Sequence, residues 1–232
     1  VANGSDQIDG GDGTSGAGWN DDVIRAGAGN DTINGGLGND SIDAGIGNDQ
    51  ILLTGAYGND TIDGGAGTDT LNGSTLSGAT TVTFNNGAGS FNSAAGNATF
   101  TNMEAVQTGT AADTVTISGT TAGSFDTGAG DDTINAGGSG ADTIVAGEGN
   151  DRINLGTSHG NDTITGGAGS DTLSGATFPG SQPATVTFTN GSGTFVSSGG
   201  NAGFNTIEVI ETGAGNDVIN AAGNTGTATF IT

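Results

Sequence analysis

A nine-residue unit recurs along this chain with little change. Residues 26–34 read AGAGNDTIN, and residues 35–43 follow directly with GGLGNDSID. Position six of the unit is aspartate and position eight is aliphatic. A short, regular period limits the chain to repeat architectures such as solenoids, because each unit can bury its apolar side only against its neighbours.

The aspartates at position six fall into two blocks in which a spacing of nine residues predominates. The first block contains Asp22, Asp31, Asp40, Asp49, Asp60 and Asp69, and the second contains Asp132, Asp142, Asp151, Asp162 and Asp171. Isolated copies of the unit place Asp6, Asp113 and Asp217 in the same frame. An aliphatic residue follows each block aspartate by two positions, so the acidic and apolar positions share one register.

A longer period lies above the short one. The aspartates from Asp40 to Asp69 return after 102 residues, and the TVTF of residues 81–84 returns after 104. The sequence is therefore a tandem duplication, and because both ends fall inside a unit we expect a segment of a longer repetitive protein. We divide it into an entry coil (1–21), a first repeat block (22–72), a metal-poor β spacer (73–126), a second block (127–174), and a further spacer with a partial third block (175–232).

Composition excludes several classes of function. The net charge is −23, and Arg25 and Arg152 are the only basic residues besides one histidine. Phosphate binding requires clustered Lys and Arg, so nucleic acid is excluded, and anionic membranes would repel this surface. No apolar run approaches the ~20 residues of a membrane span, and the lack of cysteine rules out disulfides. A chain with 49 glycines and this charge would normally be disordered, so a fold requires multivalent cations or a partner surface.

The unit has the pattern of a short strand followed by a tight turn. Alternation places Ile33 inward and its neighbours outward, and the glycines that follow supply the positive φ that a reversal requires. Two units, or eighteen residues, then complete one coil, which stacks Ile24 over Ile42 and Ile33 over Ile51. We therefore expect an all-β solenoid of parallel strands with two interior aliphatic ladders.

Two segments, 73–112 and 175–212, lack the aspartate register. They alternate β-branched and aromatic residues with small polar ones, as at 81–84, which is a strand pattern. We expect them either to continue the solenoid as metal-free coils or to pack on it as a hairpin.

The turns have the chemistry of a metal site. Coiling brings aspartates of successive coils together, where their carboxylates repel one another unless a divalent cation lies between them. Calcium takes six to eight oxygens and mixes carboxylates with carbonyls, whereas magnesium demands a tight octahedron and zinc would need His or Cys. We predict about seven or more Ca²⁺ ions, held by the pairs Asp22/Asp40, Asp31/Asp49, Asp40/Asp60, Asp49/Asp69, Asp132/Asp151, Asp142/Asp162 and Asp151/Asp171.

The nonapeptide resembles the RTX (repeats-in-toxin) motif, glycine-glycine-x-glycine-x-aspartate-x-aliphatic-x. The resemblance is strong over 22–72 and 127–174 and weak near Asp6, Asp113 and Asp217. It implies a right-handed parallel β-roll with two nonapeptides per coil, folding triggered by calcium, and bacterial type I secretion to the extracellular space or cell surface. It also implies that calcium is bound by the aspartates of the two blocks, by Asp113 and Asp217, and by turn carbonyls, here those of Gly27, Gly29, Gly36 and Gly38.

The sequence departs from this motif in two ways. Alanine replaces the first glycine at Ala26, Ala44, Ala136 and Ala146, which is tolerable if that position has negative φ. Residues 157–159 interrupt one turn and count against a metal site there. We expect His159 to be a loop residue of this variable turn, because nothing supports a Ser–His–Asp site.

Other polar positions have plainer explanations than catalysis or ligand binding. Glu104 and Glu208 are the same position in the two copies, which favours a structural role over a catalytic carboxylate pair. Outward threonines at position seven form ladders of a kind that can bind ice, but Gln50 and Arg152 interrupt them.

Two functions from different classes fit these features. The duplication and the lack of a catalytic constellation favour a calcium-binding structural segment of a bacterial surface-layer, matrix or adhesin protein that can self-assemble. The alternative is a C-terminal secretion and folding module of a secreted hydrolase or toxin whose catalytic domain lies outside this chain. We expect no enzymatic activity from this chain. The expected partners are calcium ions and either other copies or neighbouring domains, with a cell-surface polysaccharide as a further candidate.

Overall fold

The computed structural model describes residues 4–10, 21–176, 178 and 182–232, and the regular elements in these ranges are all β-strands. The chain divides into two compact units, Val1–Ala111 and Ala112–Thr232. The first unit contains the first repeat block and the following spacer up to Ala111, and the second contains the rest of that spacer, the second block and the C-terminal spacer. Within the described ranges no helix has the length and apolar character needed to cross a bilayer.

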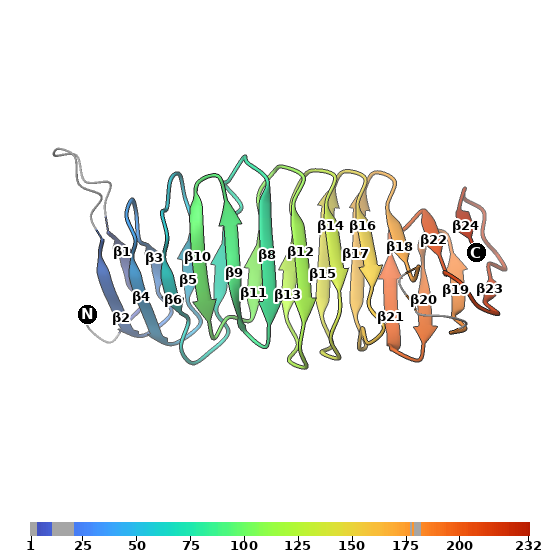
Figure 1. Cartoon of the computed structure of the whole chain (residues 1–232), viewed down its shortest axis with the longest axis horizontal. Coiled ribbons are helices and arrows are strands. Elements are labelled where there is room, and N and C mark those ends of the chain that lie inside the picture. Colours follow the sequence, from blue (N-terminus) through green and yellow to red (C-terminus); the bar gives the residue numbers. More distant parts are fainter. Residues whose placement is uncertain (1–3, 11–20, 177, 179–181) are drawn as a thin grey trace. The chain divides into compact units, whose positions relative to one another are not determined.

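The first unit consists of two walls of strands. One wall contains, in spatial order, the parallel strands β1 (Gln7–Asp9), β3 (Thr32–Asn34), β5 (Gln50–Leu52), β7 (Thr70–Asn72) and β11 (Ala105–Gln107). The other contains β2 (Val23–Ala28), β4 (Ser41–Ile46), β6 (Thr61–Asp63), β10 (Gly96–Thr101), β9 (Ala88–Ser93) and β8 (Thr80–Asn85). Consecutive strands of the repeat block alternate between the walls, so the chain winds into the β-roll that the sequence predicts (Figure 1).

Parallel pairing in register stacks the aliphatic residues of position eight. Ile24 pairs with Ile42 in one wall, and Ile33 pairs with Ile51 in the other. Ile33 and Ile51 are both 0% exposed. Burial of each such side chain contributes roughly 1.5–3 kcal/mol, which an isolated nine-residue unit could not obtain. The predicted coil of eighteen residues and its two aliphatic ladders are confirmed.

The spacer of the first unit forms part of a wall. Strands β8, β9 and β10 make an antiparallel meander, and β10 pairs in parallel with β6. Its aromatic residues fill the interior, where Phe84 packs on Phe100 and Tyr57 packs edge-on against Phe91. The spacer therefore continues the solenoid, and the alternative that it packs on the outside as a hairpin is wrong.

The second unit repeats this plan. One wall contains β13 (Ser124–Asp126), β15 (Thr143–Glu148), β17 (Thr163–Ala168), β21 (Gly200–Asn205), β20 (Ser192–Ser197), β19 (Thr185–Thr189) and β23 (Val218–Asn220). The other contains β12 (Thr114–Ser118), β14 (Thr133–Ala136), β16 (Arg152–Leu155), β18 (Thr172–Ser174), β22 (Val209–Glu211) and β24 (Thr229–Ile231). The meander is now β19–β20–β21, and β21 pairs in parallel with β17.

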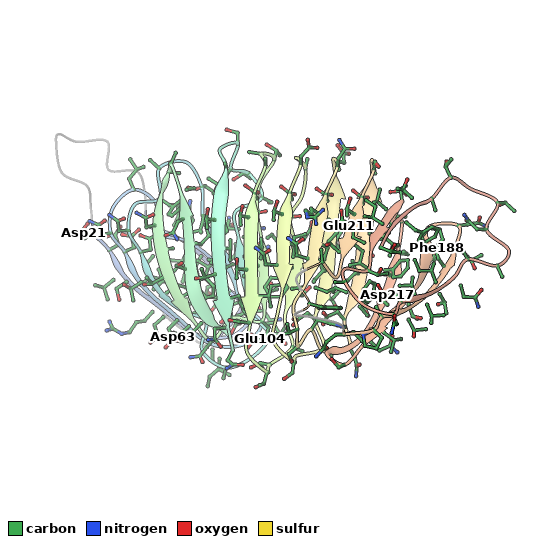
Figure 2. All side chains as sticks on the ribbon, turned by 45° about the vertical axis from the view of Figure 1, so that its right-hand side comes forward. Asp21, Asp63, Glu104, Phe188, Glu211 and Asp217 are labelled. Atoms are coloured by element: carbon green, nitrogen blue, oxygen red, sulfur yellow. The ribbon has the colours of Figure 1, made fainter. Side chains whose placement is uncertain are left out.

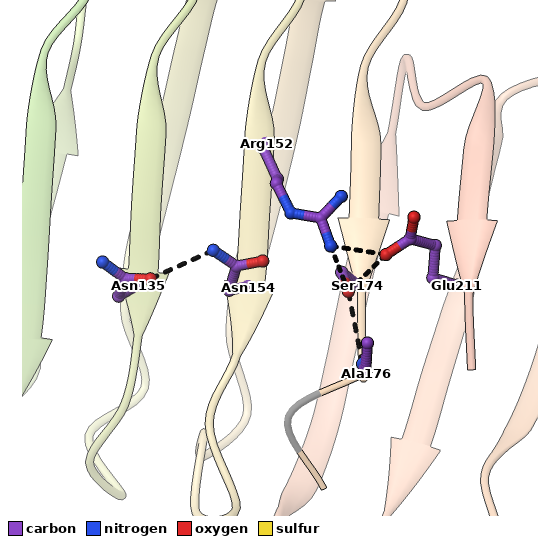
Figure 3. Close-up of polar contacts among 6 residues, drawn as sticks. All are labelled: Asn135, Arg152, Asn154, Ser174, Ala176 and Glu211. Atoms are coloured by element: carbon purple, nitrogen blue, oxygen red, sulfur yellow. Dashed lines mark hydrogen bonds and ion pairs between the residues drawn. The ribbon is translucent and has the colours of Figure 1, made fainter. Parts of the chain in front are cut away.

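Polar side chains link neighbouring strands on the outer face of the second unit. Arg152 donates hydrogen bonds to Ser174 and to the carboxylate of Glu211 (Figure 3). On the same wall, the amide of Asn154 donates to Asn135 over 3.0 Å (Figure 3). The Arg152 hydrogen bond lowers the pKa of Glu211 below its usual range. One of the two arginines is thus paired with Glu211.

Alanine at position one fits the core, as the sequence predicts. No residue of this set has positive φ, and their exposed fractions are 1% or less. The set comprises Ala26, Ala44, Ala136 and Ala146. Their methyl groups therefore add to the interior without straining the turn.

Candidate metal centre

The position-six aspartates line the turns at the edges of the walls, and most of them are buried. Acidic side chains are almost never fully buried unless they are paired. Those exposed by 3% or less are Asp31, Asp40, Asp49, Asp60, Asp69, Asp113, Asp132, Asp142, Asp151, Asp162 and Asp171. With one arginine bound to Glu211, little basic charge is left to compensate them.

Each predicted aspartate pair is joined by a hydrogen bond between successive coils. The backbone N–H of the earlier aspartate donates to Oδ1 of the later one, as from Asp31 to Asp49 over 2.8 Å. The same bond joins Asp22 to Asp40, Asp40 to Asp60, Asp49 to Asp69, Asp132 to Asp151, Asp142 to Asp162 and Asp151 to Asp171. The sequence predicts carboxylates that simply face and repel one another, but in the structure one oxygen of each pair already binds a backbone amide.

The second carboxylate oxygen is the one without a partner. Among the residues that the structure describes, Oδ2 is buried and accepts no hydrogen bond in Asp6, Asp22, Asp31, Asp40, Asp49, Asp69, Asp132, Asp151, Asp162, Asp171 and Asp217. An uncompensated buried carboxylate costs several kcal/mol, so these atoms call for a positively charged ligand. Glycine at position one leaves room around them, since a Cβ on Gly35 would lie 2.4 Å from Oδ2 of Asp40.

The turn glycines predicted to offer carbonyls have the backbone conformation that a reversal requires. Gly27 and Gly36, at position two, have φ of 111° and 94°, and Gly29 and Gly38, at position four, have φ of 136° and 140°. Carbonyls of this set stack from coil to coil, because that of Gly29 lies 1.7 Å from where a Cβ on Gly47 would sit. Carbonyl oxygens of the turn glycines therefore form columns along the turns.

Burial raises the pKa of many of these aspartates. The pKa reaches about 7 for Asp60 and Asp162, where loss of solvent is the largest cause and the charge of the preceding aspartate adds to it. For the same first reason the pKa is about 6 for Asp69, Asp132 and Asp171. Burial also raises the pKa of Asp40, Asp49, Asp142 and Asp151. A bound divalent cation opposes these shifts, because it stabilises the ionised form.

The composition of such a site favours calcium. Among the described residues, no three or more His, Asp or Glu side chains gather into a group that could hold a metal. A site in these turns therefore uses at most two carboxylates and must complete its shell with carbonyls or water. Calcium accepts that mixture readily, and zinc does not.

The isolated copies of the unit join these columns. The N–H of Asp6 donates to Oδ1 of Asp31 over 2.7 Å, and that of Asp113 donates to Oδ1 of Asp132 over 2.7 Å. Asp217 accepts the N–H of Ala184 over 2.8 Å. Sequence reasoning placed Asp113 and Asp217 in the ligand set and left Asp6 out of it, although its backbone continues the column.

His159 lies in the loop between β16 and β17, as the sequence predicts, but it is fully buried. Its exposed fraction is 0%, its Nε2 lies 2.8 Å from Ser197 Oγ, and its ring stacks on Phe178. It is the second-copy equivalent of Tyr57, which bonds to Ser93 in the first unit. The turn that it was expected to interrupt keeps its hydrogen bond between Asp142 and Asp162, so residues 157–159 anchor the meander without breaking the column.

Sequence reasoning missed a second ladder at position five. The N–H of Asn48 donates to Oδ1 of Asn30, and the N–H of Asn59 donates to Oδ1 of Asn39. These bonds run from the later coil to the earlier one, opposite to the aspartate ladder. The signal was the Asn-Asp dipeptide that ends many of the turns.

Fold and turns together define a β-roll with columns of buried, unpartnered carboxylate oxygens at its edges. The model of the family described as RTX calcium-binding nonapeptide repeat (4 copies) matches residues 16–51, 52–75, 126–159, 157–177 and 200–225. These ranges cover more than half of the chain, so the chain belongs to this family and is a calcium-binding segment. No curated protein matches the sequence.

Proposed function

We propose that this chain is an extracellular structural segment that folds when calcium binds after secretion. The observation that carries the proposal is the set of buried Oδ2 atoms with no partner, in a chain of net charge −23. In the folded state the carboxylates of each column repel one another, so the fold needs positive charge that the side chains of this sequence do not supply.

The position-six aspartates would hold the ions through Oδ2, and carbonyls of the turn glycines, including Gly27, Gly29, Gly36 and Gly38, would complete the shell. Bound calcium supplies two positive charges per site and links two successive coils. The free energy of binding then becomes free energy of folding, as in other chains that fold around a metal. The seven aspartate pairs support at least seven ions.

The same chemistry suits export. In a calcium-poor cytosol, repulsion between the carboxylates disfavours the folded solenoid, and an unfolded chain can pass through a secretion channel. Outside the cell, millimolar calcium binds in the turns and allows the chain to fold. We place the segment on this basis at the bacterial cell surface or in the extracellular space.

The structural role is proposed over catalysis on the nature of the polar residues. The single histidine is buried between Ser197 and Phe178, and no carboxylate in the described part of the chain is within hydrogen-bonding contact of it. The acidic residues follow the period of the repeat instead of gathering at one place. A repetitive solenoid of this kind suits a surface layer, matrix or adhesin in which copies associate.

The first test compares the chain with EGTA and with millimolar calcium by far-UV circular dichroism. We expect β-sheet signal only with calcium, and equal spectra in the two conditions would contradict the proposal. Light scattering and electron microscopy of the calcium-loaded chain test assembly separately. Growth of sheets or filaments supports the surface-layer role, whereas a calcium-folded chain that stays monomeric at high concentration contradicts that role.

A further inference from the structure

The spacer of the first unit ends in a glutamate that takes the place of a turn aspartate. Strand β11 pairs with β7 so that Val106 stacks on Leu71. Glu104 precedes Val106 by two residues, so it occupies position six of its coil. The N–H of Asp69 donates to Oε2 of Glu104 over 2.8 Å, as other aspartates donate to the next coil. In return the carbonyl of Asp69 accepts the N–H groups of Glu104 and Ala105.

The second unit contains the same arrangement. Ile210 stacks on Leu173, so Glu208 stands at position six. The N–H of Asp171 donates to Oε2 of Glu208 over 2.9 Å. The contact therefore follows from the position in the coil and not from one local packing accident.

The oxygens beside these contacts lack donors. Asp69 and Asp171 are both 0% exposed, and Oδ2 of each is without a hydrogen-bond partner. A carbonyl approaches the same place, because a Cβ on Gly64 would lie 2.1 Å from the oxygen of Asn102 and 2.9 Å from Oδ2 of Asp69. On Gly166 the matching distances are 2.1 Å and 2.6 Å. Only glycine, which has no Cβ, leaves room at these two positions for the carbonyl oxygen and the aspartate Oδ2.

Nearby charges are negative. Asp63 lies on the same edge as Glu104 (Figure 2), and both raise the pKa of Asp69 in addition to the larger effect of burial. Glu208 raises the pKa of Asp171 in the same way, after burial and Asp151. A neutral structural cap would not require a carboxylate here, since an amide oxygen accepts a backbone N–H equally well.

We propose that Asp69 with Glu104, and Asp171 with Glu208, form two further calcium sites that extend the aspartate columns by one coil. Each site combines the unpartnered Oδ2, the glutamate carboxylate and the adjacent carbonyl, an oxygen set that a hard divalent cation takes. The proposal rests on the proposed function, because it adds two ions to those that the seven aspartate pairs hold. Glu104 lies outside every range that the family model matches.

The test counts calcium ions in the whole chain and its variants by equilibrium dialysis with metal analysis. Glu104→Gln and Glu208→Gln keep an oxygen that can accept the aspartate N–H but remove the charge. We expect each to bind one ion fewer than the unaltered chain, and the double variant two fewer. Glu148→Gln removes the same charge from an exposed side chain and leaves the count unchanged.

Asp49→Asn separates the failure of this proposal from that of the proposed function. If it loses an ion while the glutamate double variant loses none, the two further sites are wrong and the calcium-binding turns stand. If the unaltered chain binds no calcium, both ideas fail. Should a variant not fold, a crystal structure of the unaltered chain with calcium decides, because the absence of anomalous density beside Oδ2 of Asp69 and Asp171 overturns the proposal.

Discussion

We expect a rise in pH to strengthen calcium binding and to destabilise the ion-free fold. Asp60 and Asp162 should contribute most to both effects. Burial raises the pKa of each to about 7 without metal. Calcium binds the ionised carboxylate, so it must displace the proton. At about pH 6 a group with a pKa of about 7 is ionised to about one tenth, and the affinity of its site is then about tenfold lower than at about pH 8.

The ion-free fold follows the reverse sign. The folded pKa lies above the ordinary aspartate value of 3.8, so the folded chain keeps protons that the unfolded chain has released. Its stability is therefore greatest below about pH 4 and is lost as the pH rises through about 7. Protonation and calcium are thus alternative ways to neutralise the same columns.

Calcium titrations followed by far-UV circular dichroism at about pH 8, 7 and 6 measure the first effect. The midpoint for the whole chain is expected to rise by a few-fold to about tenfold over this range, because only some sites have carboxyls with a pKa near 7. An acid titration in EGTA measures the second effect, with β-sheet signal gained as the pH falls. A calcium midpoint independent of pH, or an ion-free chain that loses β structure on acidification, would refute the reasoning.

Two further changes test the core and the turns, with Ile46→Ala, whose side chain is 65% exposed, as a control expected to have little effect. Ile51→Ala leaves a cavity between Ile33 and Leu71 and should lower the free energy of unfolding by about 2–5 kcal/mol in saturating calcium, measured with guanidinium chloride. Gly45 has φ 107°, and a Cβ on it would lie 2.0 Å from the Gly27 carbonyl oxygen. Gly45→Ala should therefore lower the free energy of unfolding by at least about 1–3 kcal/mol and weaken calcium binding, measured by thermal melting and calcium titration. Loss of stability no greater than that of the control would contradict either expectation.

The repeat block was the part of the fold that sequence could predict. A nine-residue period with one inward side chain leaves few alternatives, and Ile33 over Ile51 follows directly from it. The antiparallel meander of β8–β9–β10 was left open, because alternation identifies strands but not their partners. The loop position of His159 was predicted, but its burial was not, because its partner Ser197 lies 38 residues away and belongs to the meander.

The candidate site was predictable in its residues but not in its hydrogen bonding. The spacing brought the right aspartates together, yet nothing in it indicates that Oδ1 already accepts an amide from the neighbouring coil. Sequence reasoning gave Glu104 a structural role and did not place it at position six, because the glycines that mark a turn are missing before it. The register of Val106 on Leu71, visible only in the folded chain, assigns its position.

The two ladders of opposite direction have a mechanical consequence. The amide of Asp31 depends on the coil after it and that of Asn48 on the coil before it, so a coil inside a unit is held from both sides and a terminal coil from one. Under tension, a unit with this structure peels from its ends, and its length grows in steps of roughly one coil, as the linear contacts of a solenoid require. The free calcium concentration then sets the load at which peeling starts and lets the coils rewind when the load falls.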